Sequence, residues 1–291
     1  MTKLLLFYLS LFSFFWLLAP ITNAAEKPEI ELGFLAVEGY YPHYTGSNEY
    51  YMGAVLLPYG VIRDPYYEAG ETNRFFIHNG DKLDLELGFF GRMPLWNEGK
   101  NAPAPAGIED PDREFIHKKS WARRGMDHQP IIFQFGLKTT YLFNEHLYTI
   151  LPFYHGRGLV IGAPSAGFNF TPSVRFDFFD RQSKHALVFS IGREYGDEKY
   201  NSEIYSVRAK DVLEGRPAYQ ARSGLIASEV ALLASFEVHP KLDLIFTYLV
   251  TDMSDSELTD SPLVATTHNR LWVIGFMYKF LSSRKMVEIH K

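Results

Sequence analysis

Residues 268–280 read H-N-R-L-W-V-I-G-F-M-Y-K-F, and their side chains alternate in character with a period of two. Because successive side chains of a strand point to opposite faces, one face is entirely large and apolar while the other is mixed. A strand of a soluble sandwich gives a similar alternation, but aromatic groups at both ends of the apolar row favour a strand that crosses a bilayer. The apolar face holds Trp272, Ile274, Phe276, Tyr278 and Phe280, and the mixed face holds Val273, Gly275, Met277 and Lys279.

The end of this stretch is similar to the C-terminal insertion signal of bacterial outer-membrane β-barrels. The signal is carried by the terminal Phe280, by Tyr278 two residues before it, and by Gly275. The resemblance implies that the barrel-assembly machinery is a partner. It also implies that the earlier strands close against this one.

Composition narrows the classes of protein further. The 291 residues include no Cys, so neither a disulfide framework nor a thiolate metal site can form. Aromatic residues make up 16%, a load that a bilayer-facing surface explains, and the formal net charge is −5 with no basic stripe. Nucleic acid is therefore not expected as a partner. No His pair has the helical spacing of a zinc site, and we expect neither a metal nor a cofactor.

The first 24 residues read as a signal peptide. Lys3 precedes the apolar run 4–18, and the small residues before Ala24 suit a cleavage site. The alternative is an uncleaved single-span anchor, for which the run is short. No later stretch is apolar over about 18 residues, the length that a membrane helix needs. We therefore expect one domain, 25–291, that crosses the outer membrane as a closed barrel and ends in a short polar tail, 281–291.

The same alternation recurs through the chain, and its connections alternate in length. Short turns are expected at 79–80, 144–145, 180–184 and 239–240, and long polar loops at 96–128, 196–223 and 252–267. This asymmetry is typical of an antiparallel transmembrane β-barrel with tight periplasmic turns and long external loops. If both ends of the barrel lie in the periplasm, the number of strands must be even. Residues 29–80 hold too few good crossings for four full strands, which favours ten strands and leaves twelve open.

Polar residues at every second position of the predicted strands would face the barrel lumen. They carry both signs of charge, so they indicate either a selective pore or a filled lumen in which the charges pair with one another. The candidates are Asp84, Glu86, Gln134, Lys138, Asn169, Arg175, Asp177, Glu229, Glu237, Asp243 and Lys279.

Several segments together resemble the MipA/OmpV family of Gram-negative outer-membrane proteins. No single segment is specific, but their order and spacing over about 30–280 resemble the family's pattern. One departure is the tail 281–291, which follows the aromatic residue where such proteins usually end. The matching segments are 41–50, 57–59, 197–207, 215–224 and 260–264.

This resemblance implies an outer-membrane barrel without established catalysis, regarded as a scaffold that links a murein transglycosylase to a murein synthase. Outer-membrane lipid and lipopolysaccharide would surround it. Some members are tied to adhesion or stress response. A narrow channel, or a receptor or adhesin for small solutes or surface ligands, is the alternative function.

A hydrolase is the third hypothesis. Residues 162–167 superficially resemble a nucleophile elbow around Ser165, but no helix follows, as that motif requires. Histidines could supply a base, although a single sequence does not show which side chains meet. We expect His117, His128, His155 and His239 to be solvated or interfacial residues of loops and strand ends.

Overall fold

The computed structural model describes residues 26–70, 73–92, 95–103, 114–116, 118–129, 131–158, 165–180 and 183–288. The expected signal peptide, 1–24, and His117 lie outside these residues. Nearly all of the regular structure is strand, as the alternation predicts. The strands of the first half are β1 (Glu26–Pro28), β2 (Ile30–Pro42), β3 (Glu49–Asp64), β4 (Tyr67–Ala69), β5 (Asn73–Asn79), β6 (Leu83–Arg92), β7 (Phe115–Ile116) and β8 (Ile132–Leu142). The remaining elements are β9 (Leu147–Gly158), β10 (Ser165–Phe170), β11 (Ser173–Asp177), β12 (His185–Gly196), α2 (Glu198–Tyr205), the 3-10 helix η2 (Ala209–Asp211), β13 (Gly224–His239), β14 (Leu242–Asp252), β15 (His268–Ser282) and β16 (Met286–Glu288).

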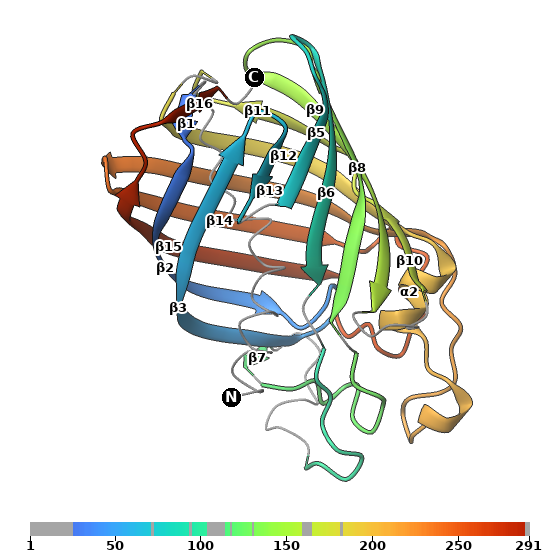
Figure 1. Ribbon diagram of the computed structural model, residues 1–291. Coiled ribbons are helices and arrows are strands. Elements are labelled where there is room, and N and C mark those ends of the chain that lie inside the picture. Colours follow the sequence, from blue (N-terminus) through green and yellow to red (C-terminus); the bar gives the residue numbers. More distant parts are fainter. Residues whose placement is uncertain are drawn as a thin grey trace.

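The strands form a closed antiparallel barrel (Figure 1). Neighbours along the chain pair in turn, β12 pairs with β13, and β15 pairs with β2 to complete the ring. Both β10 and β11 pair with β9 and with β12, so they are two halves of one crossing. The barrel therefore has twelve strands, the count that the sequence left open, and not the favoured ten. The difference comes from β4 and β5, a hairpin too short to show a repeating pattern.

The outer surface of the barrel carries the apolar row of each strand. Along β15, Ile274 is 53% exposed and Phe276 is 48% exposed, whereas Val273, the residue before Ile274, is fully buried. Large apolar side chains are exposed in the same way around the ring, for example Phe135 on β8 and Phe246 on β14. Such a surface is stable in hydrocarbon and costly in water.

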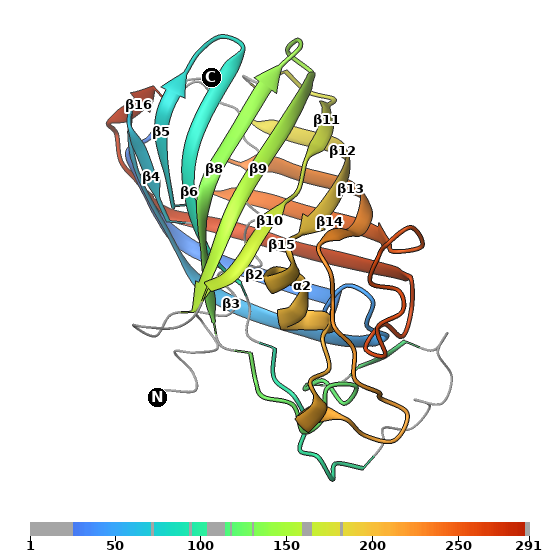
Figure 2. The same ribbon diagram turned by 90° about the vertical axis from the view of Figure 1, so that its right-hand side faces the viewer.

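The two ends of the barrel differ. The short turns lie at one end of the barrel, and the long connections gather at the other (Figures 1 and 2). These turns join β5 to β6, β8 to β9, β11 to β12, and β13 to β14. Helix α2 belongs to the long connection between β12 and β13 and lies beside β10 (Figure 2). It is the longest helix in the part of the chain that the structure describes, and no helix there is long and apolar enough to span a membrane.

Residues 281–288, which follow Phe280, are not a loose extension. Strand β15 continues to Ser282, and β16 then pairs with β1 in a separate two-stranded sheet at the turn-bearing end. The backbone N–H of Glu29 donates to the carbonyl of Lys285 at 2.9 Å, and Val287 is buried. A strand of three residues is too short to be recognised by alternation, which is why the sequence indicates only a polar tail there.

Candidate functional site

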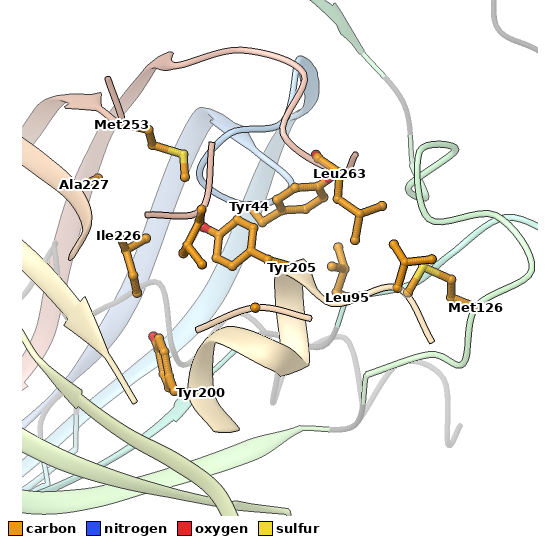
Figure 3. Close-up of a cluster of buried hydrophobic side chains, with 12 residues drawn as sticks. Tyr44, Leu95, Met126, Tyr200, Tyr205, Ile226, Ala227, Met253 and Leu263 are labelled. Carbon is orange, nitrogen blue, oxygen red and sulfur yellow. The ribbon is translucent and has the colours of Figure 1, made fainter. Parts of the chain in front are cut away.

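Loops gather at one end of the barrel and contact one another there (Figure 2), and we name them the cap, defined as the described residues of 43–48, 95–129, 197–223 and 253–267. Loops of this length bury apolar side chains only by packing on one another. Figure 3 shows the resulting cluster, which also includes two residues at the start of β13. Its members are Tyr44, Leu95, Met126, Tyr200, Tyr205, Val207, Ala221, Ile226, Ala227, Met253, Leu258 and Leu263.

Two buried tyrosines join the first loop to loops that lie far away in the sequence. The Tyr44 hydroxyl donates to the carbonyl of Leu263 at 2.8 Å, and the Tyr205 hydroxyl donates to the carbonyl of Thr45 at 2.9 Å. Burial raises the pKa of both phenols above its usual value, so both stay protonated donors at neutral pH. Ser261 completes the junction by donating to the carbonyl of Tyr205 at 2.7 Å.

Asn269, near the start of β15, ties the first loop to the barrel wall. Its side-chain oxygen accepts from the N–H of Gly46 at 2.6 Å, and its amide nitrogen donates to the carbonyl of Ser47 at 2.7 Å. Gly46 adopts a φ of 93°, in the region that favours glycine. Both the oxygen and the nitrogen of the Asn269 side chain therefore form hydrogen bonds to the loop 43–48, which fixes this loop against β15.

Helix α2 is positioned by its first residues. The carboxylate of Asp197 accepts from the N–H of Tyr200 at 2.7 Å, which caps the helix N-terminus. Asn201 is fully buried and donates to the carbonyl of Arg222 at 2.7 Å, joining the helix to the end of its own loop. The helix thereby presents Tyr200 and Tyr205 to the apolar cluster.

Two buried arginines bridge the loop 95–129 to the loop 197–223. Arg216 donates to the carbonyls of Ala122 at 2.7 Å and Arg124 at 2.9 Å, and Arg123 donates to the carbonyls of Glu203 and Ile204. Burial lowers the pKa of Arg216, and it lowers that of Arg123 to about 10. Both remain charged at neutral pH, and charge-assisted hydrogen bonds of this kind are about twice as strong as neutral ones.

Glu49, the first residue of β3, anchors the same loop from the barrel. Its side chain is fully buried, and one carboxylate oxygen accepts from the backbone N–H groups of Trp121 at 2.9 Å and Ala122 at 2.8 Å. The cap is thus held by individual polar groups that reach between loops.

Inside the barrel, toward the turn-bearing end, opposite charges alternate across eight adjacent strands. We name this set the charge belt. Its N–O distances run from 2.5 Å, between Arg63 and Glu31, to 4.0 Å, between Lys279 and Glu31. Every member has a partner of opposite sign, which is how charges persist out of bulk water. In strand order the belt is Asp243, Lys279, Glu31, Arg63, Glu68, Arg74, Glu86 and Lys138.

The structure brings three pairs of the predicted lumen residues together. Lys138 contacts Glu86 at 2.6 Å, Lys279 contacts Asp243 at 2.8 Å, and Gln134 donates to Asn169 at 2.9 Å. Of the others, Glu237 lies opposite Asp243 in the β13–β14 register. Asp84 and Asp177 are buried, Arg175 and Glu229 are half-buried, and Glu237 pairs with the exposed Lys184 at the turn-bearing end.

Four members of the charge belt were missed by the sequence, namely Glu31, Arg63, Glu68 and Arg74. They lie in the region where the strand pattern is interrupted. The available signal was the alternation of charge sign from Arg63 to Glu68 to Arg74, but without the hairpin's register nothing indicates that those charges meet.

The remaining predicted residues have local roles. The Ser165 hydroxyl accepts from the N–H of Gly167, within the first residues of β10, and His155 packs on Phe168 with ring centroids 4.4 Å apart. Residues 162–164 of the elbow-like stretch lie outside the described part. In the described ranges no group of three or more His, Asp or Glu side chains could hold a metal ion.

The three residues of the expected insertion signal lie at the β15–β2 seam or on the outer surface. A Cβ at Gly275 would lie 2.6 Å from the carbonyl oxygen of Ala36, so the close approach of β2 requires glycine there. Tyr278 and Phe280 are exposed on the outer surface, where Phe280 contacts Phe34 with ring centroids 5.4 Å apart.

Comparison with known proteins gives one family match. The family described as MltA-interacting protein MipA matches residues 35–280. No curated protein matches the chain. Of the segments that carry the earlier resemblance, the parts 43–48, 197–207, 215–223 and 260–264 lie in the cap.

Solved structures show only a distant likeness. The NanC porin is 9% identical, with 85% of this chain and 100% of that chain covered and a TM-score of 0.41. The translocator domain of the autotransporter NalP from Neisseria meningitidis is 10% identical, with 88% and 89% covered and a TM-score of 0.43. OmpT of Vibrio cholerae is 9% identical, with 88% and 98% covered and a TM-score of 0.39. At these identities and TM-scores, the likeness carries no argument about function.

Proposed function

Because the chain belongs to the MipA family and is a β-barrel of the outer membrane, we propose that it is a non-catalytic envelope scaffold whose lumen is closed. The observation that carries this proposal is the cap, in which four loops are joined by buried hydrogen bonds and one apolar cluster. A diffusion pore needs an open mouth, and its loops would not be fastened to one another across it.

The charge belt supports the closed lumen. An ion that crosses a selective pore uses side chains with spare capacity to bind it. Here the two signs balance one another along the ring, so a passing ion would have to separate existing pairs. Such a belt stiffens the wall and offers no single-sign path.

The partners are proposed from the family's description, which names interaction with MltA, a murein transglycosylase. A murein synthase is the second proposed partner. If the long loops face outside the cell, the turn-bearing end faces the murein. That end carries the β1–β16 sheet and the short turns, and we place the docking surface there.

The experiment is a pull-down of the full chain from solubilised envelope, read for murein enzymes. We expect enrichment of a transglycosylase and a synthase over an unrelated barrel of similar size. Truncation after Ser282, which removes β16, should reduce the enrichment, whereas Arg216→Ala in the cap should leave it unchanged. Failure to enrich either enzyme would contradict the scaffold.

A receptor or adhesin is the second candidate function. It is favoured by the placement of the family-like segments, most of which meet in the cap. A third, hydrolytic function would require an activity that Ser165→Ala abolishes. The hydroxyl of Ser165, the first residue of β10, instead accepts a local backbone hydrogen bond from Gly167.

A further inference from the structure

The outer surface of the barrel carries a row of aromatic side chains close to the loop-bearing end. Tyr248 on β14, Trp272 on β15 and Tyr40 on β2 are direct partners in the strand register. All three share the outward face of their strands with exposed apolar residues such as Ile274 and Phe34. Aromatic rings gather at the level of the lipid headgroups in proteins that cross a bilayer. The row therefore marks the membrane interface at this end of the barrel.

A segment of the loop 95–129 joins the wall beside this row. Strand β7 pairs in parallel with the start of β3, where Glu49 lies opposite Phe115 and Tyr50 lies opposite Ile116. Figure 1 shows β7 next to this end of β3. The other edge of β3 is occupied by β2, so β7 extends the wall by a short piece. One loop of the cap is thus also a part of the wall.

The register places the side chain of Ile116 on the outer face. Side chains that lie opposite each other on adjacent strands point to the same side of a sheet. Tyr50 belongs to the outward set of β3, together with Met52 and Leu56, which are 49% and 60% exposed. Ile116 is 58% exposed, as this facing predicts, whereas Leu95 of the same loop is buried in the cap. A large apolar side chain on this face is stable against lipid and costly in water.

The charge two residues before Ile116 is neutralised. One carboxylate oxygen of Glu114 accepts from the Tyr40 hydroxyl at 2.6 Å and from the guanidinium of Arg270 at 2.9 Å. The ring of Tyr40 also stacks on that of Tyr50, with centroids 4.4 Å apart. A charge close to hydrocarbon is costly unless it is paired. The pair of Glu114 and Arg270 therefore brings no net charge to this surface.

We propose that residues 114–116 anchor the cap in the bilayer, with Ile116 inserted at the boundary between lipid headgroups and acyl chains. The aromatic row sets the depth, and the exposed side chain of Ile116 supplies the apolar contact. The occupant of this surface is the lipid leaflet, because Ile116 lies on the same face of the same sheet as the lipid-facing side chains of β3. Since Glu114 and Arg270 neutralise each other, the anchor requires no charged lipid.

The anchor would fix the position of the cap relative to the membrane surface. The loop 95–129 is already held to the barrel by Glu49, which accepts from Trp121 and Ala122, and to the loop 197–223 by Arg216. Lipid contact at Ile116 adds an attachment on the outside of the wall. The bilayer then stabilises a loop whose other attachments all lie within the protein.

The test uses single cysteines, since the chain has none of its own. Ile116→Cys reports the proposed anchor, Ile274→Cys the lipid-facing wall two residues beyond Trp272, and Val212→Cys the exposed surface of the cap. Each full chain is labelled with a fluorophore while unfolded and is then folded into phosphatidylcholine vesicles. The vesicles hold lipids with a nitroxide either on the headgroup or in the middle of the acyl chain. Heat-modifiable mobility shows that each barrel is closed.

We expect the Ile116 label to lose most of its fluorescence to the headgroup nitroxide and less to the mid-chain nitroxide. The Ile274 label should show the reverse order, and the Val212 label should be quenched by neither and stay open to iodide in the water. An Ile116 label that behaves like the Val212 label would overturn the proposal. An Ile116 label that behaves like the Ile274 label would place β7 in the hydrocarbon and overturn the interfacial depth.

Two further measurements test the role of charge. Glu114→Ala in the Ile116→Cys chain should weaken the headgroup quenching, while the same change should leave the Ile274 label unaffected. Unchanged quenching of the Ile116 label would overturn the role of Glu114. Added salt or anionic lipid should leave the Ile116 label as it is. Quenching that occurs only with anionic lipid would mean that a charged headgroup is recognised, which contradicts the proposal.

Discussion

The barrel wall and the cap of this protein are built by opposite means. In the wall, backbone ladders supply the order, and the outward side chains share one property, that they are apolar. In the cap few backbone groups pair in regular ladders, and order depends on single side chains such as Asn269, Arg216 and Tyr44. The wall should therefore tolerate any exchange within its chemical class, whereas the cap should be sensitive to the loss of one hydrogen-bonding group.

The largest effect is expected from a charge on the outer wall. Phe276→Arg places a guanidinium on the lipid face near the middle of β15, at a cost of about 2–4 kcal/mol at the bilayer midplane. We expect loss of heat-modifiable mobility, the sign of a closed barrel. Phe276→Leu keeps the apolar class and should assemble normally. If both variants assembled alike, the assignment of this face to lipid would be wrong.

The next largest effect is expected in the cap, and it should leave the wall intact. Arg216→Ala leaves the carbonyls of Ala122 and Arg124 without their donor, and each unsatisfied buried acceptor costs about 1–3 kcal/mol. We expect a folded barrel whose loop 197–223 is cut faster by protease. Arg222→Ala, at an exposed position, serves as the control. Loss of barrel assembly in Arg216→Ala would mean that the stability of the wall depends on the cap.

A smaller effect is expected from Tyr44→Phe, which removes one hydroxyl and keeps the ring in the apolar cluster. The lost hydrogen bond to Leu263 is worth about 1 kcal/mol. Hydrogen exchange of the amides in 253–267 should become moderately faster, with little change in 197–223. An effect as large as that of Arg216→Ala would contradict the ranking of these contacts.

The smallest effect is expected from an exposed ion pair on the cap. Hydrogen bonds from Lys210 and Arg208, both at 2.8 Å, lower the pKa of Asp127 below its ordinary 3.8. Because this pKa is lower in the folded protein than in the unfolded chain, ionised Asp127 stabilises the folded cap at any pH above its ordinary pKa. This contribution is lost as the pH falls through the pKa of the folded state. The protection of the amides in 118–129, that is, their exchange rate relative to the intrinsic rate at the same pH, should therefore decrease slightly in acid. Asp127→Asn should lack this response, and an unchanged response in that variant would assign it to another group.

The sequence predicts the wall well because alternation is a local property. The expected final strand 268–280 corresponds to β15, and the alternating stretch from Leu83 to Phe90 lies within β6. It fails at β4, which has three residues and no period. The alternation also predicts which side chains of a strand share a face, but not whether the inner face is polar or apolar. Met277 lies on the mixed face, but it is 1% exposed within a buried apolar cluster.

The cap could not be predicted in this way, although its segments carry the family resemblance. Arg216 and Ala122 are separated by 94 residues, and the acceptors of Arg216 are backbone carbonyls, which have no signature in the sequence. The charge belt has the same difficulty, because Arg63, Glu68 and Arg74 meet only through the register of a short hairpin. Long-range contacts to the backbone are visible only once the fold is known.

The closed lumen is the central claim, and the conductance of the full chain in a planar bilayer tests it most directly. With the four loops joined across the mouth and the charge belt paired, the chain should insert without giving a defined unit current. Arg216→Ala, in which the cap is loosened, should show current steps that the native chain lacks. A well-defined and long-lived open state of the native chain would contradict the closed lumen and favour a channel.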